Sequence, residues 1–152
     1  MNSFEFFVPT RIVFQEYAVK NRLVEQIRAL KVSSILVITD KGVAGAGPLK
    51  EVVATLDQAG IKYAVFDEVE PNPSTDTCMK AFQAAREIGA GATIAVGGGS
   101  SMDVAKAVGI LMNNGGDLES YEGPDKFENQ MLPMISILTT AGTRSELTPF
   151  AV

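Results

Sequence analysis

Histidine and tryptophan are absent from this sequence of 152 residues, and cysteine occurs only once, at Cys78. Without histidine, the chain cannot form a Ser-His-Asp or Cys-His catalytic arrangement. It also lacks the imidazole and thiolate clusters that bind zinc or iron. A single cysteine excludes an internal disulfide, and Cys78 is expected to be a packing residue on a helix face. Any chemistry must therefore come from carboxylates, hydroxyls, lysine or a bound cofactor.

Long apolar runs and an excess of positive charge are also missing. No run approaches the roughly 18 apolar residues that span a bilayer, and no basic region precedes an apolar core at the N-terminus, as it does in a secretory signal. The 13 lysines and arginines are scattered among 18 acidic residues, which gives a net charge of −5. Nucleic-acid binding is not expected, because neutralising phosphates requires clustered basic side chains. We expect a cytoplasmic protein with neither nucleic acid nor a membrane as its partner.

The sequence alternates short apolar runs with segments whose apolar residues recur at helical spacing. Strands are expected at 33–40, 62–69, 92–96 and 134–140, with helices at 23–30, 49–56, 79–88 and 101–112. A weak edge strand is expected at 11–14, and the glycine-rich stretch 41–48 is expected to be a loop that leads into a helix at Pro48. This alternation predicts an α/β fold with a doubly wound, mostly parallel, Rossmann-like sheet over residues 1–152. Ligands of such sheets bind at the carboxyl ends of the strands.

The stretch "AVGGGSS" joins the third buried strand to the helix that follows it. Backbone amides at a helix N-terminus favour an anion, and glycine lets that backbone approach a phosphate closely. Ser100 and Ser101 add hydroxyl donors. The stretch is neither GxGxxG, because Met102 occupies the sixth position, nor a P-loop, because no GK[ST] is present. The alternative is a tight turn that needs a positive φ, for which one glycine usually suffices.

Other candidate residues follow the strands, and each allows two interpretations. Asp40 could accept both hydroxyls of an adenosine ribose, where its charge would repel a 2′-phosphate, or it could be a simple N-cap. Asp103 and Lys106 lie one helical turn apart, so they could face a ligand at the glycine loop or form a surface ion pair. The stretch "TTAGT" at 139–143 could surround a nucleotide or form a hydroxyl-rich turn.

Three motifs together resemble the iron-containing (group III) alcohol dehydrogenases. They are "VEPNPS", "AVGGGSSMDVAKAVG" and "LTTAGTRSELT", in the order and spacing of that family over nearly the whole chain. Among its members, the lactaldehyde reductase and propanediol or butanol dehydrogenase kinds look most similar. Glycerol dehydrogenase and dehydroquinate synthase are more distant relatives with a similar glycine loop.

The resemblance implies reversible hydride transfer between a primary alcohol or diol and NAD(P), with a divalent metal, iron or zinc, polarising the substrate oxygen. Asp40 would hold the adenosine ribose and favour NAD, and Asp103 would lie near the nicotinamide. The glycine loop, which consists of Gly97, Gly98, Gly99 and Ser100, would cradle the pyrophosphate. Asn72 would line the cleft, and three threonines would surround the nucleotide. The implied cofactor residues are Asp40, Asn72, Gly97, Gly98, Gly99, Ser100, Asp103, Thr139, Thr140 and Thr143.

Two departures from the family pattern limit what the resemblance implies. Family enzymes are more than twice as long, and an all-helical second domain supplies an aspartate and three histidines to the metal; this sequence ends at "LTPFAV" and has no histidine. We therefore expect a truncated dinucleotide-binding domain without turnover of its own, and a homo-oligomer. Arg144 stands where the family has glycine or alanine, which makes NADP a possible cofactor. The alternatives are a non-catalytic nucleotide-binding module and an activity like that of glycerol dehydrogenase or dehydroquinate synthase.

Overall fold

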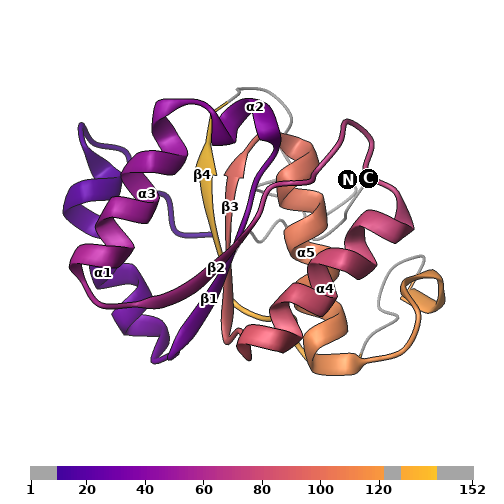
Figure 1. Cartoon of the computed structure of the whole chain (residues 1–152). Helices are drawn as coiled ribbons and strands as arrows, with labels where there is room; N and C mark the ends of the chain where they lie inside the picture. The colour runs from indigo at the N-terminus through magenta and orange to yellow at the C-terminus, as the bar shows by residue number, and fades with distance from the viewer. Residues whose placement is uncertain (1–9, 122–127, 140–152) are drawn as a thin grey trace, which may run out of the picture.

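The computed structural model describes residues 10–121 and 128–139, in which helices and strands alternate along the chain (Figure 1). None of its helices in these ranges is long and apolar enough to cross a membrane. The elements are α1 (Ala18–Leu30), β1 (Ser34–Ile38), α2 (Lys41–Ala44), α3 (Gly47–Gln58), β2 (Lys62–Phe66), α4 (Thr75–Ile88), β3 (Ala92–Gly97), α5 (Gly99–Asn114), the 3-10 helix η1 (Leu118–Tyr121) and β4 (Met134–Leu138).

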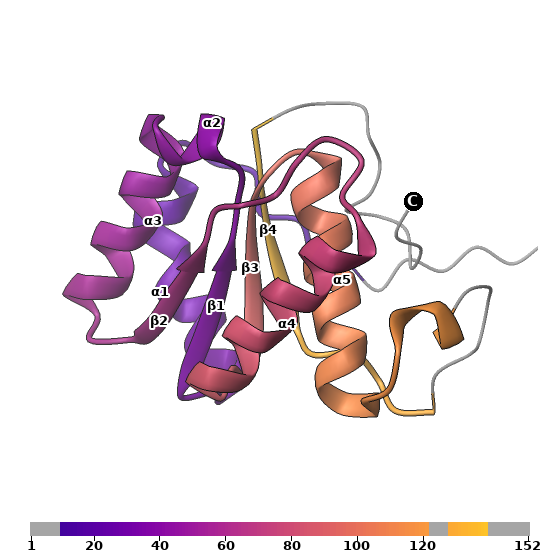
Figure 2. The same cartoon turned by 45° about the vertical axis from the view of Figure 1, so that its right-hand side comes forward.

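The four strands form one parallel sheet in the order β2-β1-β3-β4. The chain moves outward from β1 to β2, then returns to the other side of β1 with β3 and β4, so the winding reverses between β1 and β3. Helices α1 and α3 cover one face, and α4 and α5 cover the other (Figures 1 and 2). The predicted doubly wound α/β fold is confirmed, and all of the described strands are parallel.

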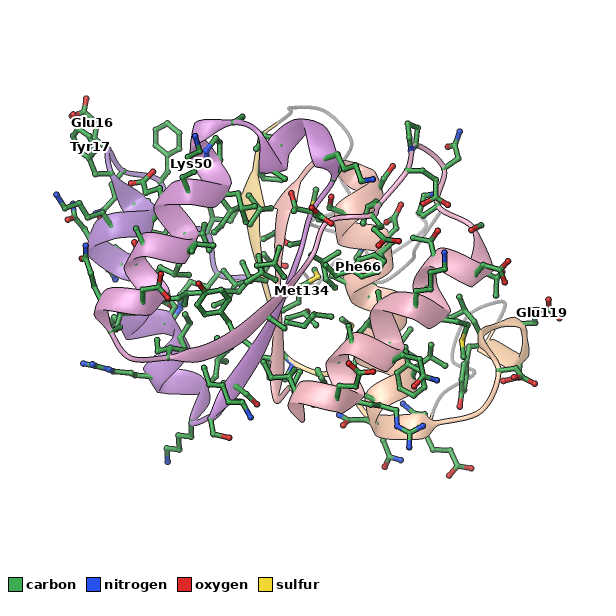
Figure 3. All side chains as sticks on the ribbon, in the orientation of Figure 1. Glu16, Tyr17, Lys50, Phe66, Glu119 and Met134 are labelled. Atoms are coloured by element: carbon green, nitrogen blue, oxygen red, sulfur yellow. The ribbon has the colours of Figure 1, made fainter. Side chains whose placement is uncertain are left out.

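Strand β1 shows why this sequence folds into three layers. All five of its residues are buried, as expected for a continuous apolar run covered on both faces. Because side chains alternate along a strand, Ile35 and Val37 pack beneath α1 and α3, whereas Leu36 and Ile38 pack beneath α4 and α5. The edge strands also contribute to the core beneath α4 and α5, through Phe66 of β2 and, less deeply, Met134 of β4 (Figure 3).

Two local expectations were wrong. Residues 11–14 form no strand, and the Phe14 side chain is fully exposed. The expected loop at 41–48 contains the short helix α2, which begins where the Asp40 side chain accepts a hydrogen bond from the Val43 amide. Such an N-cap satisfies one of the free N–H groups of a first turn, and this contact offsets the low helix propensity of Gly42.

Candidate functional site

A cavity of about 460 Å³ lies at the carboxyl ends of the strands, above the point between β1 and β3 where the winding reverses. In Figure 1 this end of the sheet is uppermost, beside α2. Open α/β sheets bind their ligands at this position. Four chain segments meet around the cavity. Its lining residues are Asp40, Lys41, Gly42, Val43, Val69, Glu70, Pro71, Gly98, Gly99, Ser100, Ser101 and Thr139.

The glycine loop provides one wall of the cavity. Gly97 ends β3 with φ at 149°, and Gly98, the N-cap of α5, has no side chain with which to cap the helix. The amides of the first turn of α5 therefore remain available to an anion, as the sequence predicted for this junction. An ideal Cβ at Gly97 would lie 2.8 Å from Ser101 Oγ and 3.4 Å from Asp40 Oδ2. A side chain at this position would thus displace the Ser101 hydroxyl and touch the Asp40 carboxylate.

Asp40 caps α2, which confirms one of its two interpretations, and it also lines the cavity. Its Oδ1 accepts a 2.9 Å hydrogen bond from the Val43 amide, and its Oδ2 lies on the side of Gly97. An ideal Cβ at Gly42 would lie 3.1 Å from Oδ1. The carboxylate is therefore seated between two glycines, with one oxygen engaged by the protein and the other directed toward the glycine loop.

The two serines that follow the three glycines differ in burial. Ser100 is partly exposed, whereas Ser101 is only 1% exposed and its Oγ has no hydrogen-bond partner within the described residues. A buried hydroxyl left without a partner costs about 1–3 kcal/mol. Such a cost is a common feature of sites that complete their hydrogen bonding with a ligand or a bound water. The family motif indicated only Ser100 as a cofactor residue, and nothing in two adjacent serines indicates that the second is buried.

Asp103 and Lys106 are not a surface ion pair. They are 7% and 2% exposed, respectively, on a helix that is buried continuously from Ser101 to Leu111. Neither residue lines the cavity. Charged side chains are rarely buried unless other groups pair with them, so this part of α5 is not a solvated helix face.

Some of the other implied cofactor residues line the cavity and others do not. Thr139 lines the cavity, and its amide donates a 3.0 Å hydrogen bond to the Gly97 carbonyl. Asn72 is exposed and is not among the lining residues, although Glu70 and Pro71 in the same turn are. Thr140, Thr143 and Arg144 lie outside the described residues.

The turn that carries Asn72 is held by Glu70, a residue that the sequence analysis did not single out. Its carboxylate accepts hydrogen bonds from the Ser74 amide at 2.9 Å, from Ser74 Oγ at 3.0 Å and from Thr77 Oγ1 at 2.6 Å. The Thr77 hydroxyl, followed by the Ser74 amide, lowers the pKa of Glu70 from 4.5 to about 2. The carboxylate is therefore ionised throughout the physiological pH range.

Cys78 is buried within the core beneath α4, which confirms its expected packing role. Burial, with smaller contributions from Glu70 and Asp103, raises the pKa of its thiol from 9.0 to about 11. Because only the thiolate is nucleophilic, we expect alkylation of the native protein at neutral pH to be about a hundredfold slower than that of an unperturbed cysteine. Iodoacetamide labelling followed by mass spectrometry tests this, with the guanidinium-unfolded chain as the fast control; equal rates would contradict it.

The fold and the cavity define an open parallel α/β protein with a glycine-lined ligand site at its switch point. The profile of the iron-containing alcohol dehydrogenase family matches residues 9–152. The chain belongs to the iron-containing alcohol dehydrogenase family.

Individual relatives are oxidoreductases of several kinds. The chain is 39% identical over 150 residues to choline dehydrogenase of Bacillus subtilis, covering 97% of this chain and 37% of the relative. It is 34% identical to lactaldehyde reductase of Escherichia coli, covering 83% and 34% of the two chains. It thus spans little more than a third of the length of these relatives.

Solved structures support the same assignment. A 1,3-propanediol oxidoreductase superposes with a TM-score of 0.90 at 34% identity, covering 97% of this chain and 38% of the other. The sulfoacetaldehyde reductase of Bifidobacterium kashiwanohense, solved in complex with NAD+, gives 0.86 at 26% identity, covering 97% and 39%. The predicted family is therefore confirmed, with an NAD complex among its structural neighbours.

Proposed function

We propose that residues 1–152 are the dinucleotide-binding domain of an NAD-dependent alcohol dehydrogenase. The observation that carries the proposal is the cavity bounded jointly by Asp40, the glycine loop and Thr139 at the switch point of the sheet. Since the chain spans little more than a third of its relatives, hydride transfer to or from a primary alcohol or diol is proposed for the longer parent enzyme. The names of the relatives cover choline, lactaldehyde and 1,3-propanediol, so the alcohol is proposed only as a class.

A nicotinamide dinucleotide fits the residues present. The backbone at Gly97 leaves no room for a side chain, the first turn of α5 offers its amides, and the buried Ser101 hydroxyl has no partner among the described residues. We assign the pyrophosphate to Gly98, Gly99 and Ser100, and the adenosine ribose to Asp40. We propose the remaining implied residues as further contacts: Gly97, Thr139, Thr140 and Thr143, together with Asn72 and Asp103, which would meet a part of the cofactor that extends beyond the cavity lining. When bound, the cofactor supplies or accepts the hydride, and this domain orients it.

The metal that the family name implies has no matching site within the residues that the structure describes. Residues 10–121 and 128–139 contain no group of three or more His, Cys, Asp or Glu side chains that could hold a metal ion. We therefore assign no metal-dependent step to any residue of this chain and place the iron or zinc in the longer parent enzyme. The chain alone is proposed to bind the cofactor without turnover, and metal-dependent alcohol oxidation near 10 per second would contradict that.

The chain is expected to bind NADH saturably, with a Kd between roughly 1 μM and 1 mM, the usual range of KM values. It should bind NADPH more weakly, because the Asp40 carboxylate would face the 2′-phosphate. Cofactor fluorescence reports both titrations, and the absence of tryptophan removes one common source of energy transfer to the cofactor. If neither cofactor binds, the proposed function is wrong and only the fold assignment stands.

A non-catalytic nucleotide-binding module is the second candidate, favoured by the lack of a metal-binding cluster in the part of the chain that the structure describes. It makes the same NADH prediction and differs for the longer protein, which would then show no alcohol oxidation with added iron or zinc. We also propose a cytoplasmic location and a homo-oligomeric state. The oligomer is supported by Ile12, Phe14 and Tyr17, which are 73%, 100% and 71% exposed near the start of α1. Light scattering that gives the monomer mass would contradict the oligomer.

A further inference from the structure

The cavity wall opposite the glycine loop consists of irregular chain between β2 and α4. It leaves the sheet near Val69, whose amide reaches the Thr39 carbonyl at a long 3.4 Å, and it rejoins regular structure at Ser74, the N-cap of α4. Between these two points Asn72 adopts a left-handed conformation, with φ at 52°. A left-handed non-glycine residue costs about 1–3 kcal/mol and persists only where its surroundings hold it in place.

Glu70 is the group that holds this turn. Its carboxylate spans the turn to reach Ser74 and Thr77, so it ties the wall to the first residues of α4. The Ser74 hydroxyl in turn accepts a 3.2 Å hydrogen bond from the Thr77 amide, which closes a compact network. Helix α4 is itself anchored by buried residues such as Ala81 and Ala85. The wall is thus linked to the core at one end through the buried Val69 and at the other through Glu70 and α4.

We propose that Glu70 is the positioning residue of this wall, and that its hydrogen bonds to Ser74 and Thr77 set the affinity of the cavity for the dinucleotide. The inference rests on the proposed function and adds to it a residue that acts through its neighbours. Glu70 and Pro71 line the cavity, whereas Thr77 does not. Because the Glu70 oxygens already accept hydrogen bonds from the protein, the carboxylate orients the wall and is not needed as a cofactor ligand.

A competing role for Glu70, electrostatic repulsion of the cofactor, predicts a change of the opposite sign in the Kd. A carboxylate in the wall of a site for an anionic diphosphate would repel it, so removing the charge would tighten binding. In the positioning role, removing the carboxylate releases the wall, and the measured Kd rises in inverse proportion to the fraction of molecules whose wall is in place. The direction of the change therefore separates the two roles.

The test compares NADH binding by the whole chain with that of Glu70→Ala, Glu70→Gln, Thr77→Val and Glu68→Ala. If the wall is in place about a tenth of the time, Glu70→Ala raises the Kd about tenfold. Thr77→Val should raise it in the same direction although Thr77 does not line the cavity. Glu70→Gln keeps one acceptor oxygen and should restore most of the affinity. Glu68→Ala removes an equal charge from an exposed position in the same segment and should leave the Kd unchanged.

All titrations are made at a temperature at which circular dichroism shows each variant to be fully folded, so that loss of stability alone cannot change the Kd. Unchanged or tighter binding by Glu70→Ala would overturn the inference. A glutamine variant as weak as the alanine variant, or equal weakening by Glu68→Ala, would also overturn it, because charge and not the hydrogen bonds would then control affinity. Failure of the unmodified chain to bind NADH is a separate result that counts against the proposed function itself.

Discussion

Gly97→Ala is expected to raise the Kd for NADH at least about a hundredfold, which corresponds to about 2.8 kcal/mol. Two effects combine at this residue. The added Cβ would lie 2.8 Å from Ser101 Oγ, which would have to move, and 3.4 Å from Asp40 Oδ2, which is ordinary van der Waals contact. The backbone at Gly97 has φ at 149°, which residues with a side chain rarely adopt. The substitution therefore disturbs both the loop and its contacts.

Two other glycines provide matched controls. Gly89 has φ at 65° with no atom within 4 Å of an added Cβ, so Gly89→Ala should lower stability through the backbone alone and leave the NADH affinity unchanged. Gly47, in the first turn of α3, is also open and has no positive φ, so Gly47→Ala should be neutral or slightly stabilising. Fluorescence titration and urea unfolding of the three variants separate binding from stability. Normal NADH binding by Gly97→Ala would show that the loop does not contact the cofactor.

The double variant Gly97→Ala/Ser101→Ala distinguishes the contact from the backbone effect. Removing Ser101 Oγ takes away the nearest atom to the added Cβ, and Ser101→Ala alone measures what the cofactor loses with that hydroxyl. If the clash dominates, the double variant regains part of the NADH affinity. If the left-handed conformation dominates, it binds no better than Gly97→Ala.

The sheet and its glycine loop could be predicted because each depends on a local pattern. The run "SILVI" is apolar at every position, which is what a strand covered on both faces requires, and it forms β1. Three glycines at the end of another such run indicated close backbone approach, and the cavity lies there. These features depend on neighbouring residues only, so one sequence suffices to predict them.

Other features depend on contacts that no short pattern encodes. Asp103 and Lys106, one turn apart, allowed two interpretations, a ligand contact or a surface ion pair. The second is wrong, because α5 is buried over eleven consecutive residues and lacks the polar stripe that marks a solvated face. The role of Glu70 follows from a left-handed residue at Asn72 that brings Ser74 and Thr77 back to it. A glutamate four and seven residues from two hydroxyls is common in sequences, and only the turn makes the three meet.

Asp40→Asn is expected to change the cofactor preference by about a hundredfold, measured as the ratio of the Kd values for NADPH and NADH. The amide keeps an Oδ1 that accepts the Val43 hydrogen bond, so α2 retains its cap. It removes the charge that would face a 2′-phosphate, and like-charge contacts of that kind cost several kcal/mol. NADH loses one charge-assisted hydrogen bond and should bind about tenfold more weakly, whereas NADPH should bind more tightly.

Asp40→Ala separates the charge from the cap, because alanine removes both. If the charge alone sets the preference, the asparagine and alanine variants should show the same NADPH to NADH ratio, and only alanine should lower the unfolding midpoint, by losing a cap worth about 1 kcal/mol. The titrations are repeated at higher salt, where a preference of electrostatic origin should shrink. A ratio that does not move in either variant would mean that Asp40 does not meet the 2′ position, and its place in the cavity would then reflect only its role as the cap of α2.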